Sequence, residues 1–496
     1  MTMQQGKGGK PVAVPVAGDA HSDTTMDTEL KSGALGLGSV LMQGVTHIAP
    51  AVGLVLSIQF IASNAGVTTP LAFGAAFLIV MTLGISLTQL ARHLPAAGGY
   101  YTYVSRTVHP RAGFLTAWLY FLYDPTGAAI NIAFMGYFFN STLKSEYGVT
   151  FPWWAFFLIA TALVTVLIYR GIEISARTVV TLGAVEVAIV VALSIAGIIH
   201  AGPGGITAAP YNPVRAPSSN GLFLGVVFSI FAFTGFESVA PLAEETREPR
   251  RTLPRAIILS LLIMGAFYLF CSYGSLVGWG THNMKSFVGS AENPVFVLAK
   301  RLWGGLWIVV FLAVINSIIA VSIACTNAAT RVFYGMARSG VLPQSLATVH
   351  PVYKTPRNAI LLQTAITLVI GLGLGFWLGP DQEYFMMGTA ITLGLIFVYG
   401  AGNLGVFRLY RGEHAREFNP LLHLVFPLFS TLALLYVGYA SISPLPAYPV
   451  SIAPFLVAVW LIAGVFLAWY LSRTGKEEWL RKAGQTAYEQ DITPPM

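Results

Sequence analysis

The sequence predicts an all-α integral membrane protein with twelve transmembrane helices. Hydrophobic residues make up 55% of the 496 residues, charged residues only 10%, and the mean hydropathy is +0.68. A soluble globular protein carries about 25% charged residues, so this composition excludes that class. Apolar runs follow one another along the whole chain, and most basic residues lie in alternate loops between them. These observations together predict the fold class.

Each apolar run is long enough to cross a bilayer as a helix, which takes about 20 residues. Helices are expected because a backbone surrounded by lipid must satisfy its own hydrogen bonds. The predicted spans are residues 36–63, 68–91, 112–140, 151–169, 176–199, 221–243, 255–279, 305–334, 357–378, 384–407, 421–441 and 450–471.

The basic residues predict the orientation. With twelve spans both chain ends lie on one side, and 23 of the 28 Lys and Arg residues fall on that side. Positive residues accumulate in cytoplasmic loops. We therefore expect a multi-pass protein of the cell (plasma or inner) membrane with cytoplasmic tails at residues 1–32 and 473–496. The net charge of +7 then reflects this bias and predicts no nucleic-acid partner. Residues 1–32 lack the apolar segment of a signal peptide.

Two of the predicted helices are interrupted. The sixth span breaks its apolar pattern at residues 232–237 (AFTGFE), and the first does so at residues 43–50 (QGVTHIAP). Interruptions in corresponding spans indicate the substrate site of a transporter built from inverted repeats. We expect repeat one at about 33–200, repeat two at about 220–410 and two further helices at 421–471, all within a domain at 33–472. The alternatives are a glycine packing contact in span six and an ordinary proline kink at Pro50.

Three sequence blocks resemble the amino acid–polyamine–organocation (APC) superfamily of transporters. The first is LPAAGGYYTY at residues 94–103. The second, at residues 235–255, holds Gly235-Phe236-Glu237, the pair Glu244-Glu245, and Pro254. The third, at residues 327–356, holds Asn327, Arg331 and a YGMAR run. The resemblance covers about residues 33–471, and the second block is the most specific.

The resemblance implies a LeuT-like fold of five plus five helices, in which broken helices one and six enclose a substrate site at mid-membrane depth. In relatives, backbone N–H groups at the first break meet a substrate carboxylate, carbonyl groups meet the amine, and an aromatic residue closes the site. The predicted substrate-binding residues are Thr46, His47, Ile48, Ala49, Asn131, Phe231, Ala232, Phe233, Thr234, Gly235 and Glu237, with Phe231 as the closing aromatic.

The first break departs from the family pattern. Relatives often carry a Gly-Ser-Gly-Ile-Phe type motif where this chain has VTHIAP at residues 45–50. Thr46 and His47 bring side chains to this point, and a histidine can also act as a proton switch. The alternative for His47 is a hydrogen-bonded packing residue. Glu237 follows the second break, where it is either a gate or a charged helix cap.

Two acidic residues inside predicted spans are candidates for proton coupling. Glu186 lies where many relatives place a Lys, on a face of span five formed by small or apolar residues; the alternative is a buried, satisfied carboxyl group. Asp124 shares a helical stripe with Gly127, Ala128 and Asn131, and it competes with Glu186 as the proton carrier or pairs with a substrate ammonium. The alternative for this stripe, and for one holding Asn316 and Asn327, is polar contact between helices.

The expected function is secondary active transport of a small amine-bearing solute, with an amino acid favoured, by alternating access coupled to protons. Sodium coupling is not excluded, and the sequence leaves the oligomeric state open. The alternatives are an amine or polyamine exchanger or uniporter, and a membrane solute sensor. No nucleotide-binding loop, nucleophile–base pair or metal-ligand cluster stands out, so we expect no enzyme, cofactor or metal. Cys271 and Cys325 are expected to be small packing residues without a disulfide.

Overall fold

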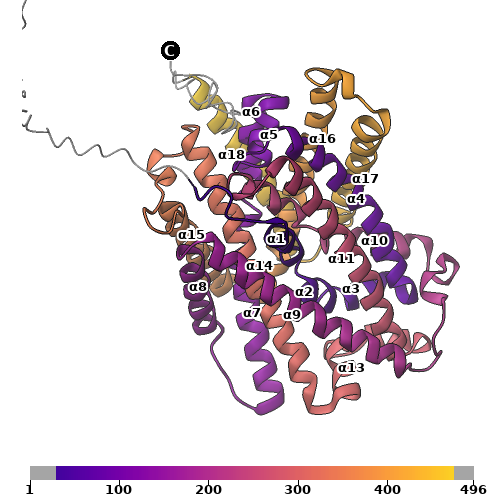
Figure 1. Cartoon of the computed structure of the whole chain (residues 1–496). Helices are drawn as coiled ribbons and strands as arrows, with labels where there is room; N and C mark the ends of the chain where they lie inside the picture. Colours follow the sequence, from indigo (N-terminus) through magenta and orange to yellow (C-terminus); the bar gives the residue numbers. More distant parts are fainter. Residues whose placement is uncertain (1–29, 474–496) are drawn as a thin grey trace, which may run out of the picture.

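A computed structural model describes residues 30–473, and most of both predicted tails lies outside this range. Within the described residues the chain is helical, with one isolated β-bridge between Leu35 and Thr246 and no strand. The prediction of an all-α membrane protein is confirmed. Figure 1 shows long helices packed side by side, with α1 near the middle of the bundle.

The principal helices follow the predicted spans closely. They are α1 (Leu37–Ile48), α2 (Pro50–Val55), α3 (Ile58–Ala65), α4 (Thr69–His93), α5 (Tyr100–Thr107), α6 (Pro110–Tyr120), α7 (Asp124–Tyr147), α8 (Trp153–Tyr169), α9 (Ile172–Ile199), α10 (Ser219–Phe231), the 3-10 helix η4 (Phe236–Glu245), α11 (Pro249–Trp279), α12 (Met284–Val288), α13 (Pro294–Trp303), α14 (Trp307–Arg338), α15 (Arg357–Leu378), α16 (Pro380–Arg411), α17 (Phe426–Ile442) and α18 (Ala453–Arg473). Short 3-10 and π turns connect several of them.

Ten helical segments of the described part are long and apolar enough to cross a membrane. The other two predicted spans correspond to α8, which has 17 residues, and to α6 with α7, which residues 121–123 separate. Pro125 stands in the first turn of α7, where the missing N–H costs no helical hydrogen bond. The protein is therefore a multi-pass membrane protein, and the count of twelve transmembrane helices stays a prediction.

Both predicted interruptions are present. Between α1 and α2 the backbone of Ala49 is left-handed, with φ of 56°, and Pro50 begins α2. This left-handed residue separates two helices, whereas an ordinary proline kink bends a single one. In the sixth span α10 ends at Phe231, and η4 starts after Gly235, whose φ of 118° favours glycine. Neither sequence segment forms a continuous helix.

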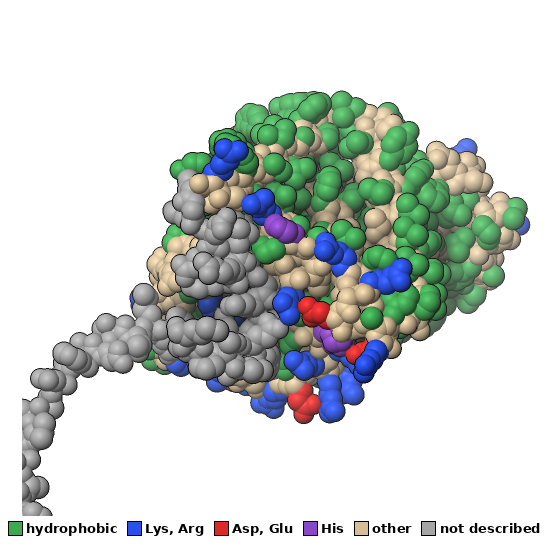
Figure 2. Space-filling view, turned by 90° about the horizontal axis from the view of Figure 1, so that it is seen from above, with side chains coloured by type: hydrophobic (Ala, Val, Ile, Leu, Met, Phe, Trp, Pro, Cys, Tyr) green, Lys and Arg blue, Asp and Glu red, His purple; other side chains and the backbone are tan. Residues whose placement is uncertain are grey.

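Burial distinguishes central from peripheral helices. In the most apolar window of the segment containing α14, 72% of residues are buried, whereas in that of the segment containing α18 only 17% are. Large apolar side chains such as Phe455, Ile462 and Phe466 project from α18, as expected for a surface that faces lipid. Figure 2 shows apolar side chains over the sides of the molecule and Lys and Arg gathered on the face at the top of Figure 1.

Candidate functional site

The two breaks touch each other. A Cβ atom added to Gly235 would lie 2.7 Å from the carbonyl carbon of His47, so only glycine allows this approach. The hydroxyl of Tyr268, on α11, lies 2.9 Å from the carbonyl oxygen of Ala232 and 3.2 Å from that of Ile48. One side chain thus contacts a carbonyl group of each break. Tyr268 is not among the residues predicted from the sequence, because an apolar span gives no sign of where a tyrosine hydroxyl points.

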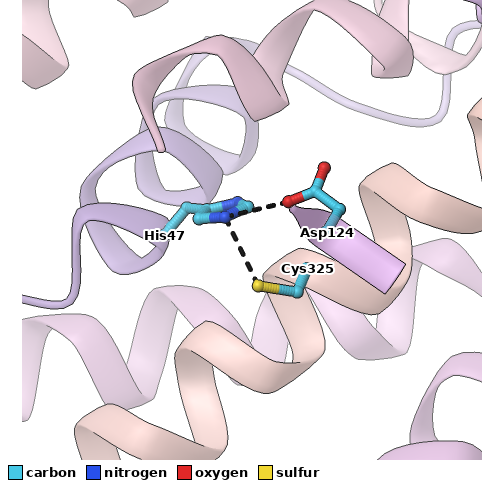
Figure 3. Close-up of side chains that lie close together, drawn as sticks. All are labelled: His47, Asp124 and Cys325. Carbon is cyan, nitrogen blue, oxygen red and sulfur yellow. Dashed lines mark hydrogen bonds and ion pairs between the residues drawn. The ribbon is translucent and has the colours of Figure 1, made fainter. Parts of the chain in front are cut away.

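A buried polar cluster lies beside the first break (Figure 3). The Nε2 atom of His47 lies 3.1 Å from Oδ1 of Asp124, 3.4 Å from Sγ of Cys325 and 3.0 Å from the hydroxyl of Tyr123. The Tyr120 hydroxyl donates to Oδ2 of Asp124. His47, Asp124 and Cys325 are at most 4% exposed. The structure therefore brings together His47 and Asp124, which the sequence placed in different spans.

Cys325 contacts a polar side chain, whereas the sequence led us to expect a small packing residue. Both cysteines are free and buried, as expected. Cys271 has a fully buried side chain in α11, but Cys325 directs its sulfur at the His47 ring. Its neighbour Gly127 of α7 leaves room for the sulfur, since a Cβ there would lie 3.2 Å from it. Among the described residues Cys325, Tyr120 and Tyr123 join the cluster without having been predicted.

The other polar residues of the two predicted stripes bond to backbone or to neighbouring helices. The Asn131 amide donates to the Gly127 carbonyl oxygen of its own helix at 2.7 Å. Asn316 and Asn327 of α14 both donate to α9, to the Leu182 carbonyl oxygen at 2.8 Å and to Ser175 Oγ at 3.4 Å. The α14 stripe therefore makes the polar contacts between helices that were the alternative.

Glu237 has features of both of its predicted roles. Its Oε2 accepts a hydrogen bond of 3.1 Å from the N–H of Gly235, so it caps the start of η4. Its Oε1 has no hydrogen-bond partner in the described part of the chain. The same side chain lines a small pocket together with Tyr100, Tyr120 and Pro241. The pocket reaches from the break to the Pro-Ala-Ala-Gly-Gly loop, where Gly98 also lines it.

Glu186 of α9 lies beside the first break. Its side chain is fully buried, and Oε2 lies 3.5 Å from the N–H of Ala51 in the first turn of α2. The next N–H, of Val52, donates to Ser317 Oγ of α14 at 3.4 Å. One turn before Glu186, a Cβ added to Gly183 would lie 2.4 Å from a Thr46 methyl group, so glycine lets α9 approach α1. Oε1 of Glu186 lacks a hydrogen-bond partner among residues 30–473.

The remaining predicted residues point in different directions. The Phe231 ring lies 3.7 Å from the position a Cβ of Gly388 on α16 would take, and its side chain is partly exposed. Phe233 is fully buried, with its ring centroid 4.9 Å from that of Tyr268. The hydroxyls of Thr234 and Thr46 donate to carbonyl groups within their own segments. The Phe233 ring thus packs in the core, and the two threonine hydroxyls bind backbone carbonyl groups of their own segments.

Two ion pairs join η4 to α14 on one side of the breaks. Arg331 donates to both carboxylate oxygens of Glu245, at 2.9 and 3.2 Å, and both side chains are fully buried. Arg338 likewise donates to both carboxylate oxygens of Glu244, at 2.9 and 2.5 Å. Glu244 also accepts from the N–H of Ala97 in the Pro-Ala-Ala-Gly-Gly loop. All three sequence blocks that carried the resemblance therefore meet here.

Comparisons with known proteins agree with this architecture. A sequence profile of the family described as "Amino acid permease" matches residues 39–481. The chain is 28% identical to the low-affinity putrescine importer PlaP of Escherichia coli (strain K12) over 395 residues, 77% of this chain and 82% of the importer. It is 25% identical to the branched-chain amino acid permease BcaP of Bacillus subtilis (strain 168) over 462 residues, 88% and 91% of the two chains. It is 25% identical to cationic amino acid transporter 5 of Arabidopsis thaliana over 410 residues, 79% and 66%.

Proposed function

The chain belongs to the amino acid permease family, and from this premise we propose that it is a secondary active transporter of a small amine-bearing solute. The observation that carries the proposal is the contact between the two helix breaks beside buried carboxyl groups. Interrupted helices leave backbone groups free to bind a polar solute, and acidic side chains favour an ammonium group. The proposed repeats, the enclosing role of Phe231 and the twelve-helix count belong to the same proposal.

An amino acid is the proposed substrate, and a polyamine or simple amine is the second candidate. The names of the relatives support both, since they include a putrescine importer and permeases for branched-chain and cationic amino acids. The buried acids Asp124 and Glu237 near the breaks favour an amine without a carboxylate. A thermal-shift screen of amino acids, diamines and monoamines on purified protein distinguishes the two, because a bound solute stabilises the folded state.

Proton coupling is proposed for Glu186. Protonated, this carboxyl group is neutral and suits its apolar surroundings; ionised, it attracts the N–H groups at the start of α2. A change in its charge would therefore alter how α2 sits against α9. Asp124 is the competing carrier, although it lies 3.1 Å from the ionisable His47 ring, whereas Glu186 contacts the uncharged N–H of Ala51.

Uptake into proteoliposomes tests the proposal as a whole. We expect a labelled solute chosen from the screen to accumulate above its external concentration when a proton gradient is imposed, inward and acidic outside. Accumulation driven only by a sodium gradient would show that the coupling ion is sodium and not the proton. Binding without accumulation under either gradient, or exchange alone, would identify a solute sensor or an exchanger.

A further inference from the structure

We propose that His47, Asp124 and Cys325 form a binding site for a divalent transition-metal ion of the zinc type. The three residues come from the end of α1, the start of α7 and the middle of α14, and they converge on one point (Figure 3). One ligand atom from each, Nε2, a carboxylate oxygen and Sγ, lies within 4.8 Å of the other two. No residue of the set lies in the same predicted span as another, so no ligand spacing was visible in the sequence.

The distances from Nε2 of His47 to the other two ligand atoms are close to those of a tetrahedral metal site. Zinc lies about 2.0–2.1 Å from imidazole nitrogen, about 2.0–2.2 Å from carboxylate oxygen and about 2.3 Å from thiolate sulfur. Tetrahedral angles then place nitrogen about 3.4 Å from oxygen and about 3.6 Å from sulfur. The observed separations are 3.1 Å from Nε2 of His47 to Oδ1 of Asp124 and 3.4 Å from Nε2 to Sγ of Cys325. Shifts of a few tenths of an ångström would admit the ion.

The contacts around His47 also favour a metal ion bound to Nε2 over a single hydrogen atom on Nε2. Nε2 faces Asp124, Cys325 and Tyr123 at once, and one hydrogen at Nε2 can point well at only one of them. A metal ion bonds to several ligands simultaneously. The Tyr123 hydroxyl adds a further oxygen 3.0 Å from Nε2. The Tyr120 hydroxyl donates to Oδ2 of Asp124, and this hydrogen bond would hold the carboxylate in a fixed orientation as a ligand.

Charge and ligand type narrow the class of ion. An ion of charge +2 bound by a thiolate, a carboxylate and a neutral imidazole forms a site without net charge, which lowers the cost of its burial. Thiolate and imidazole ligands suit Zn²⁺, Cd²⁺ and Co²⁺ and are poor ligands for Ca²⁺ and Mg²⁺. The small pocket that Tyr120 and Glu237 line is next to the cluster, since Tyr120 contacts Asp124 directly.

A second group of possible ligands, His93, His414 and Glu417, lies partly exposed at the ends of α4 and α16. Glu417 is 45% exposed on its side chain, and Arg92 approaches it at 3.7 Å, so a cation already competes for this carboxylate. This group has no sulfur. A thiolate signal therefore distinguishes the buried cluster from it.

Cobalt titration of the purified full-length protein in detergent tests the proposal. We expect Co²⁺ to produce a thiolate-to-cobalt charge-transfer band that saturates at one ion per chain and that Zn²⁺ removes. Cys325→Ser should abolish the band, and Cys271→Ser is the matched control because it removes the other buried cysteine and should leave the band intact. Absence of the band in the unmodified protein, or its persistence in Cys325→Ser, would overturn the site.

A second variant covers the case in which Cys325→Ser does not fold. His47→Gln keeps both cysteines and removes the central ligand, so the Co²⁺ affinity measured from the same band should fall at least about tenfold. An unchanged affinity would contradict the proposal. Because metal binding is measured without transport, a failure of this site and a failure of the proposed transport function give different results.

Discussion

At the scale of single residues, the two candidate proton carriers differ in their partners. Glu186 is fully buried, lies 3.5 Å from the N–H of Ala51 and leaves Oε1 unbonded among the described residues. Asp124 is equally buried but lies 3.1 Å from the His47 ring and accepts from Tyr120. A carboxyl group with few contacts can gain or lose a proton without breaking an ion pair. This contrast favours Glu186 as the group that binds and releases a proton.

The substitution Glu186→Gln keeps the size of the side chain and mimics the protonated form. We expect the variant to bind and exchange substrate yet lose accumulation driven by a proton gradient, measured as labelled uptake into proteoliposomes. Glu383→Gln is the matched control: Glu383 is a second fully buried acid, on α16, and its carboxylate oxygens have no described partner either. Accumulation that persists in Glu186→Gln would exclude Glu186, and Asp124→Asn would then be the variant to measure.

The proposed closing role of Phe231 has its own test. Phe231 ends α10 and its ring lies against Gly388 of α16, so it can bridge the break and a neighbouring helix. Phe231→Ala should raise the substrate concentration for half-maximal uptake about tenfold while the protein stays folded. Phe233→Ala is the comparison, because the fully buried Phe233 should cost stability, about 3–5 kcal/mol. Unchanged uptake kinetics in Phe231→Ala would remove it from the site.

At the scale of elements, the breaks depend on neighbouring helices that hold them. Tyr268 of α11 reaches a carbonyl of each break, and Gly183 of α9 lets α1 approach closely. On one side of the breaks, two arginine–glutamate pairs fasten η4 to α14. Alternating access requires elements that move, and buried ion pairs that can form and separate would suit such a step.

The pair between Arg331 and Glu245 should behave as a buried charge pair. Arg331→Gln leaves Glu245 uncompensated, and such a loss costs about 3–5 kcal/mol. We expect a clear fall in the melting temperature of the purified protein and recovery of much of it in the double variant Arg331→Gln with Glu245→Gln. Equal melting temperatures for the single and double variants would mean that the two side chains do not stabilise one another.

At the scale of the whole molecule, the distribution of basic residues predicts which end faces the cytoplasm. Figure 2 shows Lys and Arg gathered on one end of the bundle, and residues 247–255, just before α11 and in its first turns, carry four arginines. Positive residues retained on the cytoplasmic side would explain this asymmetry. In the predicted topology the loop between α9 and α10 faces the other side of the membrane, and Val214 in this loop is 86% exposed.

Thiol labelling tests that orientation. A cysteine replacing the exposed Arg250 should resist a membrane-impermeant thiol reagent in intact cells and react once the cells are opened. A cysteine replacing Val214 should react in intact cells and serves as the positive control. Cys271 and Cys325 are buried, so their background reaction should be small. Labelling of Arg250→Cys in intact cells would reverse the topology.

Sequence alone determined that this is an all-α membrane protein, where its helices approximately begin and end, and which two spans are interrupted. These features are local, because lipid requires each segment to satisfy its own backbone hydrogen bonds and to be apolar along its length. Glu186 was also singled out from the sequence, because the resemblance puts it where many relatives carry a Lys and because Gly183, Glu186 and Gly197 share one helical face.

Only the tertiary structure decided which side chains from separate helices meet. His47, Asp124 and Cys325 are 77 and 201 residues apart in order along the chain, and their convergence depends on the rotation of three helices about their axes. The same holds for Tyr268 at both breaks and for Arg331 with Glu245. The rotation of each helix and its distance from its neighbours are set by packing between segments, as at Gly183 and Gly235. The sequence of a single apolar span does not indicate which other span it will pack against.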